Sequence, residues 1–281
     1  MKAALYKAGI WLARITPLKV ADRFAMIMGR LACSLNKTGR SYIRANLEHI
    51  FAHDDMPVCD LNKYVLRTFQ NYTRMLIDFF RLGFMPADEL IKSVEPVGIE
   101  NCLAALTHKR GSVLITMHLG NWDYAGAYLA ARQIPMSALV EEIEPEMFEL
   151  YTQHRERTGM QTYPLARSAY AFLDVMKKNR VLAILADRDI AKNGITVTVF
   201  NGKRKIPRNL GSIIVRKKLP VVFGHLVFNP AGKKQRYCGC VEPPVFFNSE
   251  DEFNAALIRK MEEFITDHPD QWFVFQQEWV E

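Results

Sequence analysis

The chain has 281 residues, of which 49% are hydrophobic and 24% charged, and its formal net charge is +7. This composition is typical of a globular protein with a sizeable core, and it excludes a disordered chain. The five cysteines are scattered and form no C-x-x-C pair. They predict neither a metal site nor a disulfide framework, and they favour a reducing interior.

The basic excess is confined to the first 50 residues. These hold nine Lys or Arg side chains against two acidic ones, which accounts for the whole formal net charge. Two amphipathic helical patterns, at about 2–14 and about 19–35, combine these cations with aromatic and methionine side chains. Such a combination is typical of helices that lie on an anionic membrane surface. A helical pair that packs on its own domain is the alternative interpretation.

Neither N-terminal pattern predicts a membrane-spanning helix, because charged residues such as Arg14, Lys19 and Arg30 interrupt both. The first pattern is also a poor secretory signal, since Arg14 breaks its apolar portion and no convincing small-residue cleavage site follows. The basic segment has no recognisable motif for reading nucleic acid, so we expect no nucleic-acid partner.

The first 84 residues are predicted to be helical, and a long amphipathic pattern at 61–82 ends at Gly83. Further along, β-branched runs alternate with helical patterns. Strands are predicted at 112–117, about 136–140, 161–163, 181–186, 196–200, 219–228 and 235–241. Helices are predicted near 99–109, 123–132, 145–158, 167–178, 207–217 and 251–267.

This alternation predicts an α/β fold with a mixed, mostly parallel central sheet flanked by helices. We expect residues 1–84 to form a helical, membrane-associating N-terminal segment. Residues 85–281 are expected to form an α/β core, and the two parts together one structural domain.

The most informative stretch is His118-Leu-Gly-Asn-Trp-Asp123, which directly follows the first of the predicted strands. On a continuous helix, residues five apart are rotated by about 140° from a common face. A strand-to-helix turn, which Gly120 permits, instead brings His118 and Asp123 together. A histidine held by a carboxylate there suits a general base, beside a helix N-terminus that favours anions. A purely structural pair is the alternative.

A second His-x4-Asp spacing runs from His49 to Asp54. It follows an amphipathic helical segment and leads into an acidic loop. We therefore interpret it as a helix end without a catalytic setting.

Three charged residues, Asp187-Arg188-Asp189, directly follow the buried-strand pattern at 181–186. Charges at the end of an apolar strand are unfavourable unless they pair or line a cleft. If this strand is a neighbour of 112–117, Asp187 or Asp189 is within reach of His118. A satisfied Asp–Arg network at a sheet edge is the alternative. Arg155 is predicted either to face an anionic substrate or to be a solvated charge.

Several catalytic motifs are absent from the chain, namely G-x-S-x-G, G-x-x-x-x-G-K-[ST], G-x-G-x-x-G and H-E-x-x-H. Their absence argues against common serine hydrolases, P-loop nucleotidases, dinucleotide enzymes and zinc proteases. A histidine base remains without a nucleophile of its own. Such a base activates a substrate hydroxyl or water.

The strand followed by His118 and Asp123 resembles the H-x-x-x-x-D motif of the glycerolipid and lysophospholipid acyltransferase superfamily. The chain is more similar still to the bacterial lipid A biosynthesis (lauroyl/myristoyl) acyltransferases and the related phosphatidylinositol mannoside acyltransferases, over roughly residues 40–281. Beyond the motif the likeness includes Val97-Gly98, Pro145-Glu146, Arg155-Glu156, Ala186-Asp187-Arg188-Asp189, Phe200-Asn201-Gly202, Pro207 and His268-Pro269-Asp-Gln271-Trp272.

This resemblance implies a peripheral or monotopic enzyme on the cytoplasmic face of the bacterial inner membrane. It implies transfer of a fatty acyl group from acyl-CoA or acyl carrier protein, as co-substrate, to a hydroxyl of a glycolipid or phospholipid. No cofactor is expected. His118 is the implied general base with Asp123, and backbone N–H groups near Gly120–Trp122 are candidates to hold the oxyanion. The implied substrate-binding residues are Gly120, Asn121, Trp122, Arg155, Asp187, Arg188, Asp189, Gly202 and Pro207.

One departure from the family pattern concerns Asp187, which stands where the mannoside enzymes carry a glutamate. Asp187 is one methylene shorter, so the sequence leaves open whether Asp123 or Asp187 orients His118. Two other functions also remain open. One is a non-catalytic lipid-binding protein that has kept the fold, and the other is a thioesterase in which His118 activates water.

Overall fold

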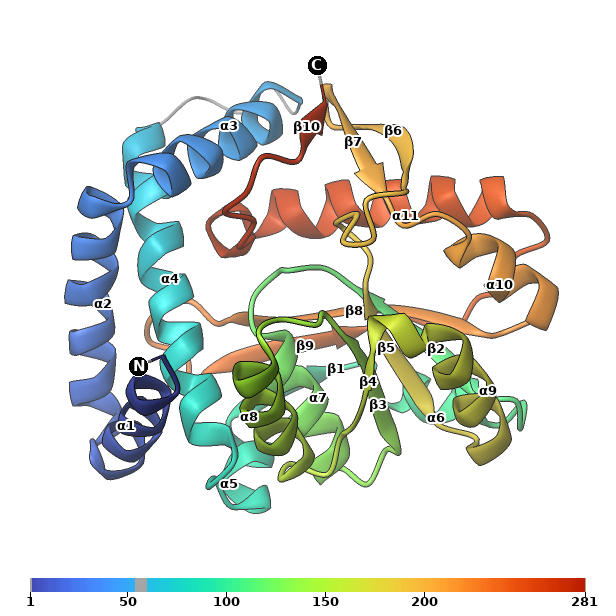
Figure 1. Ribbon diagram of the computed structural model, residues 1–281, viewed down its shortest axis with the longest axis horizontal. Helices are drawn as coiled ribbons and strands as arrows, with labels where there is room; N and C mark the ends of the chain where they lie inside the picture. The colour runs from blue at the N-terminus through green and yellow to red at the C-terminus, as the bar shows by residue number, and fades with distance from the viewer. Residues whose placement is uncertain (1, 54–59, 281) are drawn as a thin grey trace.

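The computed structural model describes residues 2–53 and 60–280. Four helices form one side of the molecule, on the left of Figure 1: α1 (Lys2–Ile15), α2 (Leu18–Leu35), α3 (Lys37–His53) and α4 (Leu61–Leu82). The predicted helical N-terminal segment is thus confirmed. Asp54, which ends the second His-x4-Asp spacing, lies outside the described residues, as does Cys59.

A seven-stranded sheet occupies the centre, in the order β1-β9-β8-β2-β5-β3-β4. Its strands are β1 (Val94–Val97), β2 (Ser112–Thr116), β3 (Met136–Val140), β4 (Gln161–Pro164), β5 (Val181–Leu185), β8 (Val221–Phe228) and β9 (Tyr237–Val241). Within this sheet β8 and β9 pair antiparallel, and the other neighbours pair parallel. The predicted mixed, mostly parallel sheet is confirmed.

A small antiparallel sheet of β6 (Ile195–Val199), β7 (Gly202–Ile206) and β10 (Trp279–Val280) lies at the top of Figure 1, beside the C-terminus. The sequence pattern did not predict β7. Its centre reads Lys203-Arg204-Lys205, and the side chain that alternation places inward is the charged, fully buried Arg204. An apolar periodicity therefore could not reveal this strand.

Helices cover both faces of the central sheet. They are α5 (Ala87–Lys92), α6 (Glu100–Leu106), α7 (Trp122–Ala131), α8 (Pro145–Glu156), α9 (Ser168–Lys178), α10 (Leu210–Lys217) and α11 (Glu250–Asp267), with short 3-10 turns η1 (Leu165–Arg167) and η2 (Pro269–Gln271).

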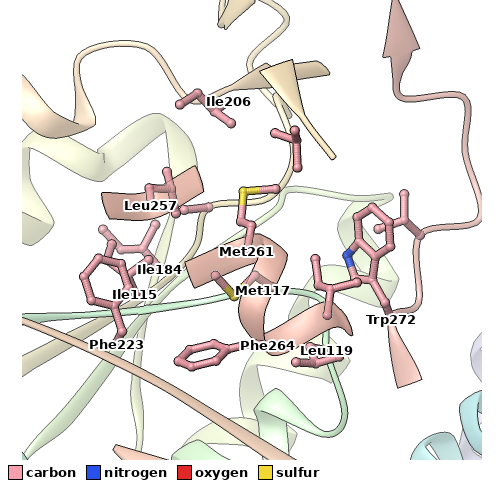
Figure 2. Packing of buried hydrophobic residues seen from close by; sticks show 14 of the residues in the cluster. Ile115, Met117, Leu119, Ile184, Ile206, Phe223, Leu257, Met261, Phe264 and Trp272 are labelled. Atoms are coloured by element: carbon pink, nitrogen blue, oxygen red, sulfur yellow. The ribbon is translucent and has the colours of Figure 1, made fainter. Parts of the chain in front are cut away.

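Alternation along β2 divides the buried side chains between two cores. Ile115, Met117 and Leu119 point to the face that α11 covers, where they meet side chains such as Met261 (Figure 2). Leu114 belongs to the core on the opposite face, together with residues of α7. Because side chains alternate along the strand, residues 114, 116 and 118 lie on the same face as α7, and His118 is therefore on that face.

Helix α2 packs in an unusual way for a surface helix. Its buried positions are the small residues Ala21, Ala25, Gly29 and Cys33. A Cβ at Gly29 would come within 2.5 Å of the Gln70 backbone, so α2 and α4 lie in close contact. The large apolar side chains of α2 face outward instead. In the described part of the chain, no helix is both long and apolar enough to cross a membrane.

A buried charge network connects α2 and α4 to the start of α7. Arg236 donates to the carboxylate of Asp22 at 2.7 and 2.8 Å and to that of Asp78 at 2.6 Å. The Tyr237 hydroxyl also donates to Asp78, and it accepts a hydrogen bond from the Asn121 amide at 2.9 Å. Removing one partner of such a buried pair typically destabilises a protein by about 3–5 kcal/mol. The network thus fixes the N-terminal helices to the core beside residue 121.

Candidate active site

A mainly apolar cavity of about 370 Å³ lies between the sheet and α7, and His118 is part of its lining. Small residues on four strands leave this space open, namely Ala138 of β3, Ala183 of β5, Gly224 of β8 and Gly239 of β9. Neighbouring strands lie about 4.8 Å apart, so the five strands from β3 to β9 span about 19 Å. The volume falls in the ordinary range for small-molecule pockets.

The His118 ring is held by Asp187. Its Nδ1 lies 2.8 Å from one carboxylate oxygen, and the backbone N–H of His118 donates to the other oxygen at 3.1 Å. The Asp187 side chain is fully buried, while that of His118 is 14% exposed. A carboxylate only accepts hydrogen bonds, so Nδ1 carries a proton, and in the neutral ring Nε2 is the nitrogen with the lone pair.

Strand register explains this pairing. β2 and β5 are parallel neighbours with Thr116 opposite Leu185. Continuing that register by two residues places His118 opposite Asp187, at the carboxyl ends of both strands. Both side chains then point to the same face of the sheet, because they follow the same alternation. The prediction that Asp187 comes within reach of His118 if the two strands are neighbours is confirmed.

Residues 271–273, near the C-terminus, hold the His118–Asp187 pair in place through hydrogen bonds. The indole Nε1 of Trp272 donates to Asp187 at 2.9 Å. The Phe273 backbone N–H donates to the carbonyl of His118 at 2.7 Å, and the N–H of Gly120 donates to the carbonyl of Gln271 at 2.8 Å. The turn that follows β2 is therefore held along its length by residues 271–273.

Three donors or cations keep Asp187 ionised despite its burial. Burial by itself raises the pKa of a carboxyl. The imidazolium form of His118, hydrogen bonds from His118 and Trp272, and the positive charge of Arg204 together outweigh this effect and hold the pKa of Asp187 below its ordinary value. The carboxylate is thus available to stabilise an imidazolium at position 118.

The structure contradicts the predicted pairing of Asp123 with His118. The Asp123 carboxylate accepts hydrogen bonds from Arg155, at 2.6 Å from Nε and 3.3 Å from Nη2. Burial lowers the pKa of Arg155, but the charge and hydrogen bonds of the Asp123 carboxylate, together with Tyr6 and Tyr151, outweigh burial and raise it. Asp123 and Arg155 thus form an ion pair that lines the cavity, and Arg155 is not a solvated charge.

Two backbone N–H groups that were candidates for an oxyanion site are already engaged. The N–H of Gly120 bonds to Gln271, and that of Asn121 bonds to the Leu226 carbonyl at 2.8 Å. Gly120 has φ +63°, and a Cβ there would lie 2.0 Å from the Leu226 oxygen, so only glycine fits. The buried Asn121 side chain accepts a hydrogen bond from the Tyr124 N–H and caps α7. Both residues therefore shape the turn.

The remaining predicted site residues divide into two groups. Trp122 lines the cavity, with its ring edge-on to His118 at a centroid distance of 5.1 Å. Arg188 is not part of the cavity lining, and it pairs with Glu278 at 2.9 Å and with the lining residue Glu141 at 3.7 Å. Asp189 accepts hydrogen bonds from backbone N–H groups of its own loop.

Gly202 and Pro207 are outside the cavity lining. A Cβ at Gly202 would lie 2.7 Å from His49 and Trp279, so close packing of β7 explains this glycine.

Comparison with known proteins identifies the chemistry. A family model described as "Bacterial lipid A biosynthesis acyltransferase" matches residues 1–281. The chain belongs to this family. It is 25% identical over 283 residues to a phosphatidylinositol mannoside acyltransferase of Mycolicibacterium smegmatis, covering 98% of this chain and 90% of the relative. The enzyme of the same name from Mycobacterium tuberculosis (strain CDC 1551 / Oshkosh) is 26% identical over 251 residues, which cover 86% of this chain and 78% of the relative.

The chain is therefore an acyltransferase, as the resemblance implied. Sequence reasoning did not give a role to two residues of this candidate site. Trp272 was noted only as part of the resemblance, although its indole holds Asp187. Arg204 was not considered, because a charged residue within an unrecognised strand carries no sequence signal. Both come close to Asp187 only through the fold.

We expect the His118 ring of the acyltransferase to show the Nδ1-protonated tautomer in nitrogen NMR spectra at neutral pH, because Nδ1 faces a carboxylate. Asp187→Asn should raise the population of the Nε2-protonated form, since an amide can also donate. Asp123→Asn is the matched control and should leave the tautomer unchanged. A predominantly Nε2-protonated ring in the unmodified protein would refute this assignment.

Proposed function

We propose that this acyltransferase moves a fatty acyl group from an acyl thioester to a hydroxyl of a glycolipid or phospholipid. The donor is acyl-CoA or acyl carrier protein. The observation that carries the proposal is the position of His118, which is oriented by Asp187 at the edge of an apolar cavity. The names of the mannoside relatives support a glycolipid acceptor.

In the proposed reaction, Nε2 of His118 takes the proton of the acceptor hydroxyl as its oxygen attacks the thioester carbonyl. The tetrahedral intermediate then expels the thiolate, and the imidazolium gives this proton to the thiolate. Asp187 accepts the Nδ1–H throughout and stabilises the imidazolium between the two steps. Transfer is direct, without an acyl-enzyme, and no cofactor takes part.

The apolar cavity is the proposed site for the acyl chain. Apart from His118, its charged lining residues Asp123 and Arg155 are paired with each other, and Glu141 is paired with Arg188. The remaining walls are chiefly aliphatic, which suits a hydrocarbon chain and excludes water from the reacting carbonyl.

Substitution of His118 by alanine tests this proposal. Purified protein with acyl-CoA or acyl carrier protein donors and a lipid extract should yield acylated lipid, detected by mass spectrometry. His118→Ala should lower the rate by at least about 10²–10⁴-fold, the usual contribution of a general base. His108→Ala, which changes an exposed histidine before β2, is the control and should retain full activity.

The same assay separates the two alternative functions. Thioester hydrolysis that does not depend on an acceptor would indicate a thioesterase. Lipid binding without transfer, across a broad panel of donors, would indicate a non-catalytic lipid-binding protein. Undiminished turnover by His118→Ala would remove this histidine from the mechanism.

We also propose that α1 and α2 bind the protein peripherally or monotopically to an anionic membrane, on the cytoplasmic face of the bacterial inner membrane. On α2 the large apolar side chains point outward, and Ile27 is 67% exposed. Phe24 and Leu31 lie on the same outward side, while small residues face α4. Lysine and arginine side chains accompany them along both helices. Buried apolar area and attraction to anionic lipid act together in such helices.

Replacement of Phe24, Ile27 and Leu31 together by serine should reduce sedimentation with phosphatidylglycerol-containing vesicles, because it removes apolar contact without disturbing the α2–α4 interface. High salt alone should release the unmodified protein only partly, since it screens charge but not apolar burial. Leu173→Ser, an exposed apolar site on α9, is the control and should bind normally. Equal vesicle binding by the triple variant would contradict the proposal.

A further inference from the structure

Arg204 is a buried cation immediately behind the His118–Asp187 pair. Its side chain is fully buried in the centre of β7. The guanidinium lies between two indoles, 4.6 Å from the ring centre of Trp272 and 4.8 Å from that of Trp279. One Nη2–H donates to the backbone carbonyl of Asp187 at 3.1 Å. Within the described part of the chain, no acceptor lies within hydrogen-bond distance of its Nε or Nη1.

This environment makes Arg204 a poor contributor to folding stability. Two aromatic faces and one carbonyl replace only part of the hydration that the guanidinium loses on folding. Burial accordingly lowers the pKa of Arg204 to about 10, although the negative charges of Asp187 and Glu278 act to raise it. Apolar residues of similar volume often match or exceed the stability that such a buried charge provides.

The charge of Arg204 acts mainly on Asp187, because most neighbouring charged residues form ion pairs with one another. Most other charged groups around the site bind one another, Asp123 with Arg155 and both Glu141 and Glu278 with Arg188, while Asp189 accepts hydrogen bonds from backbone N–H groups. The Asp187 carboxylate thus contacts the His118 ring and also interacts electrostatically with the Arg204 guanidinium. A positive charge there favours the ionised carboxylate and opposes a second positive charge on the imidazole.

We propose that Arg204 is a positioning residue for the transfer reaction: it holds Asp187 ionised and aligned with His118, and it opposes premature protonation of the base. This inference rests on the proposed function of His118. Arg204 is fully buried outside the cavity lining, so in this proposal it acts only through Asp187. Its effect is therefore on the pH dependence of transfer and on kcat.

The test compares Arg204→Met with the unmodified protein in thermal stability and in the pH dependence of kcat/KM. Without the Arg204 cation, His118 takes up a proton more readily. As the pH falls, the variant should therefore lose activity at a higher pH than the unmodified protein does. We expect kcat to fall roughly 10- to 100-fold, as when a histidine's supporting partner is removed at metal sites. Tm should stay unchanged or rise. Arg204→Lys keeps the charge, so the loss of activity at low pH (the acidic limb of the pH profile) should stay at the pH where the unmodified protein shows it.

Arg180→Met is the matched control, because Arg180 precedes the opposite end of β5 and bonds to Ser137 and the Met136 carbonyl. It should lower Tm and leave the pH profile unchanged. The NMR titration of His118 gives a readout that does not need turnover, and in Arg204→Met its midpoint should move to higher pH. If the unmodified protein transfers no acyl group, the proposed function fails while this titration still tests Arg204.

Three results would overturn the inference. One is a lower Tm in Arg204→Met with an unshifted His118 titration, which would show a structural role alone. Another is an acidic limb that Arg204→Met leaves in place. The third is an acidic limb that Arg204→Lys moves as far as Arg204→Met does.

Discussion

The site depends on one buried carboxylate. Asp187 has no contact with solvent, so every lone pair that it uses must be matched by a donor of the protein. The His118 ring, the His118 N–H and the Trp272 indole supply those donors. Each donor comes from a part of the fold that must already be assembled. The orientation of the His118 ring is therefore a property of the packed sheet and the C-terminal segment together, and not of the local H-x-x-x-x-D stretch.

Much of the fold could be predicted from the sequence, because its periodicities are local. The strand patterns at 112–117 and 181–186 correspond closely to β2 and β5, and the long helix at 61–82 to α4. The partner of His118 could not be chosen in the same way. The choice between Asp123 and Asp187 depends on which strands are neighbours and in what register, and neither is a local property of the chain. Sequence proximity favoured Asp123, whose carboxylate the fold instead pairs with Arg155.

Two further features reverse the usual relation between polarity and burial. Arg204 is the inward side chain of β7, whereas α2 buries small residues and exposes large apolar ones. Both break the rule that apolar residues lie inside. In each case a function explains the exception better than stability does. In the proposed account, the helix presents an apolar surface to a membrane, and Arg204 directs a charge at the carboxylate that orients the proposed base His118.

The most direct test of the central claim is the rate of acyl transfer by Asp187→Asn, measured beside Asp123→Asn at a pH where both variants are folded. If Asp187 orients His118, the first variant should lose about 10²–10⁴-fold in kcat. Asp123→Asn should lose less in kcat, because it disturbs only the Asp123–Arg155 ion pair that lines the cavity. Near-normal transfer by Asp187→Asn, with the large loss confined to Asp123→Asn, would contradict the account.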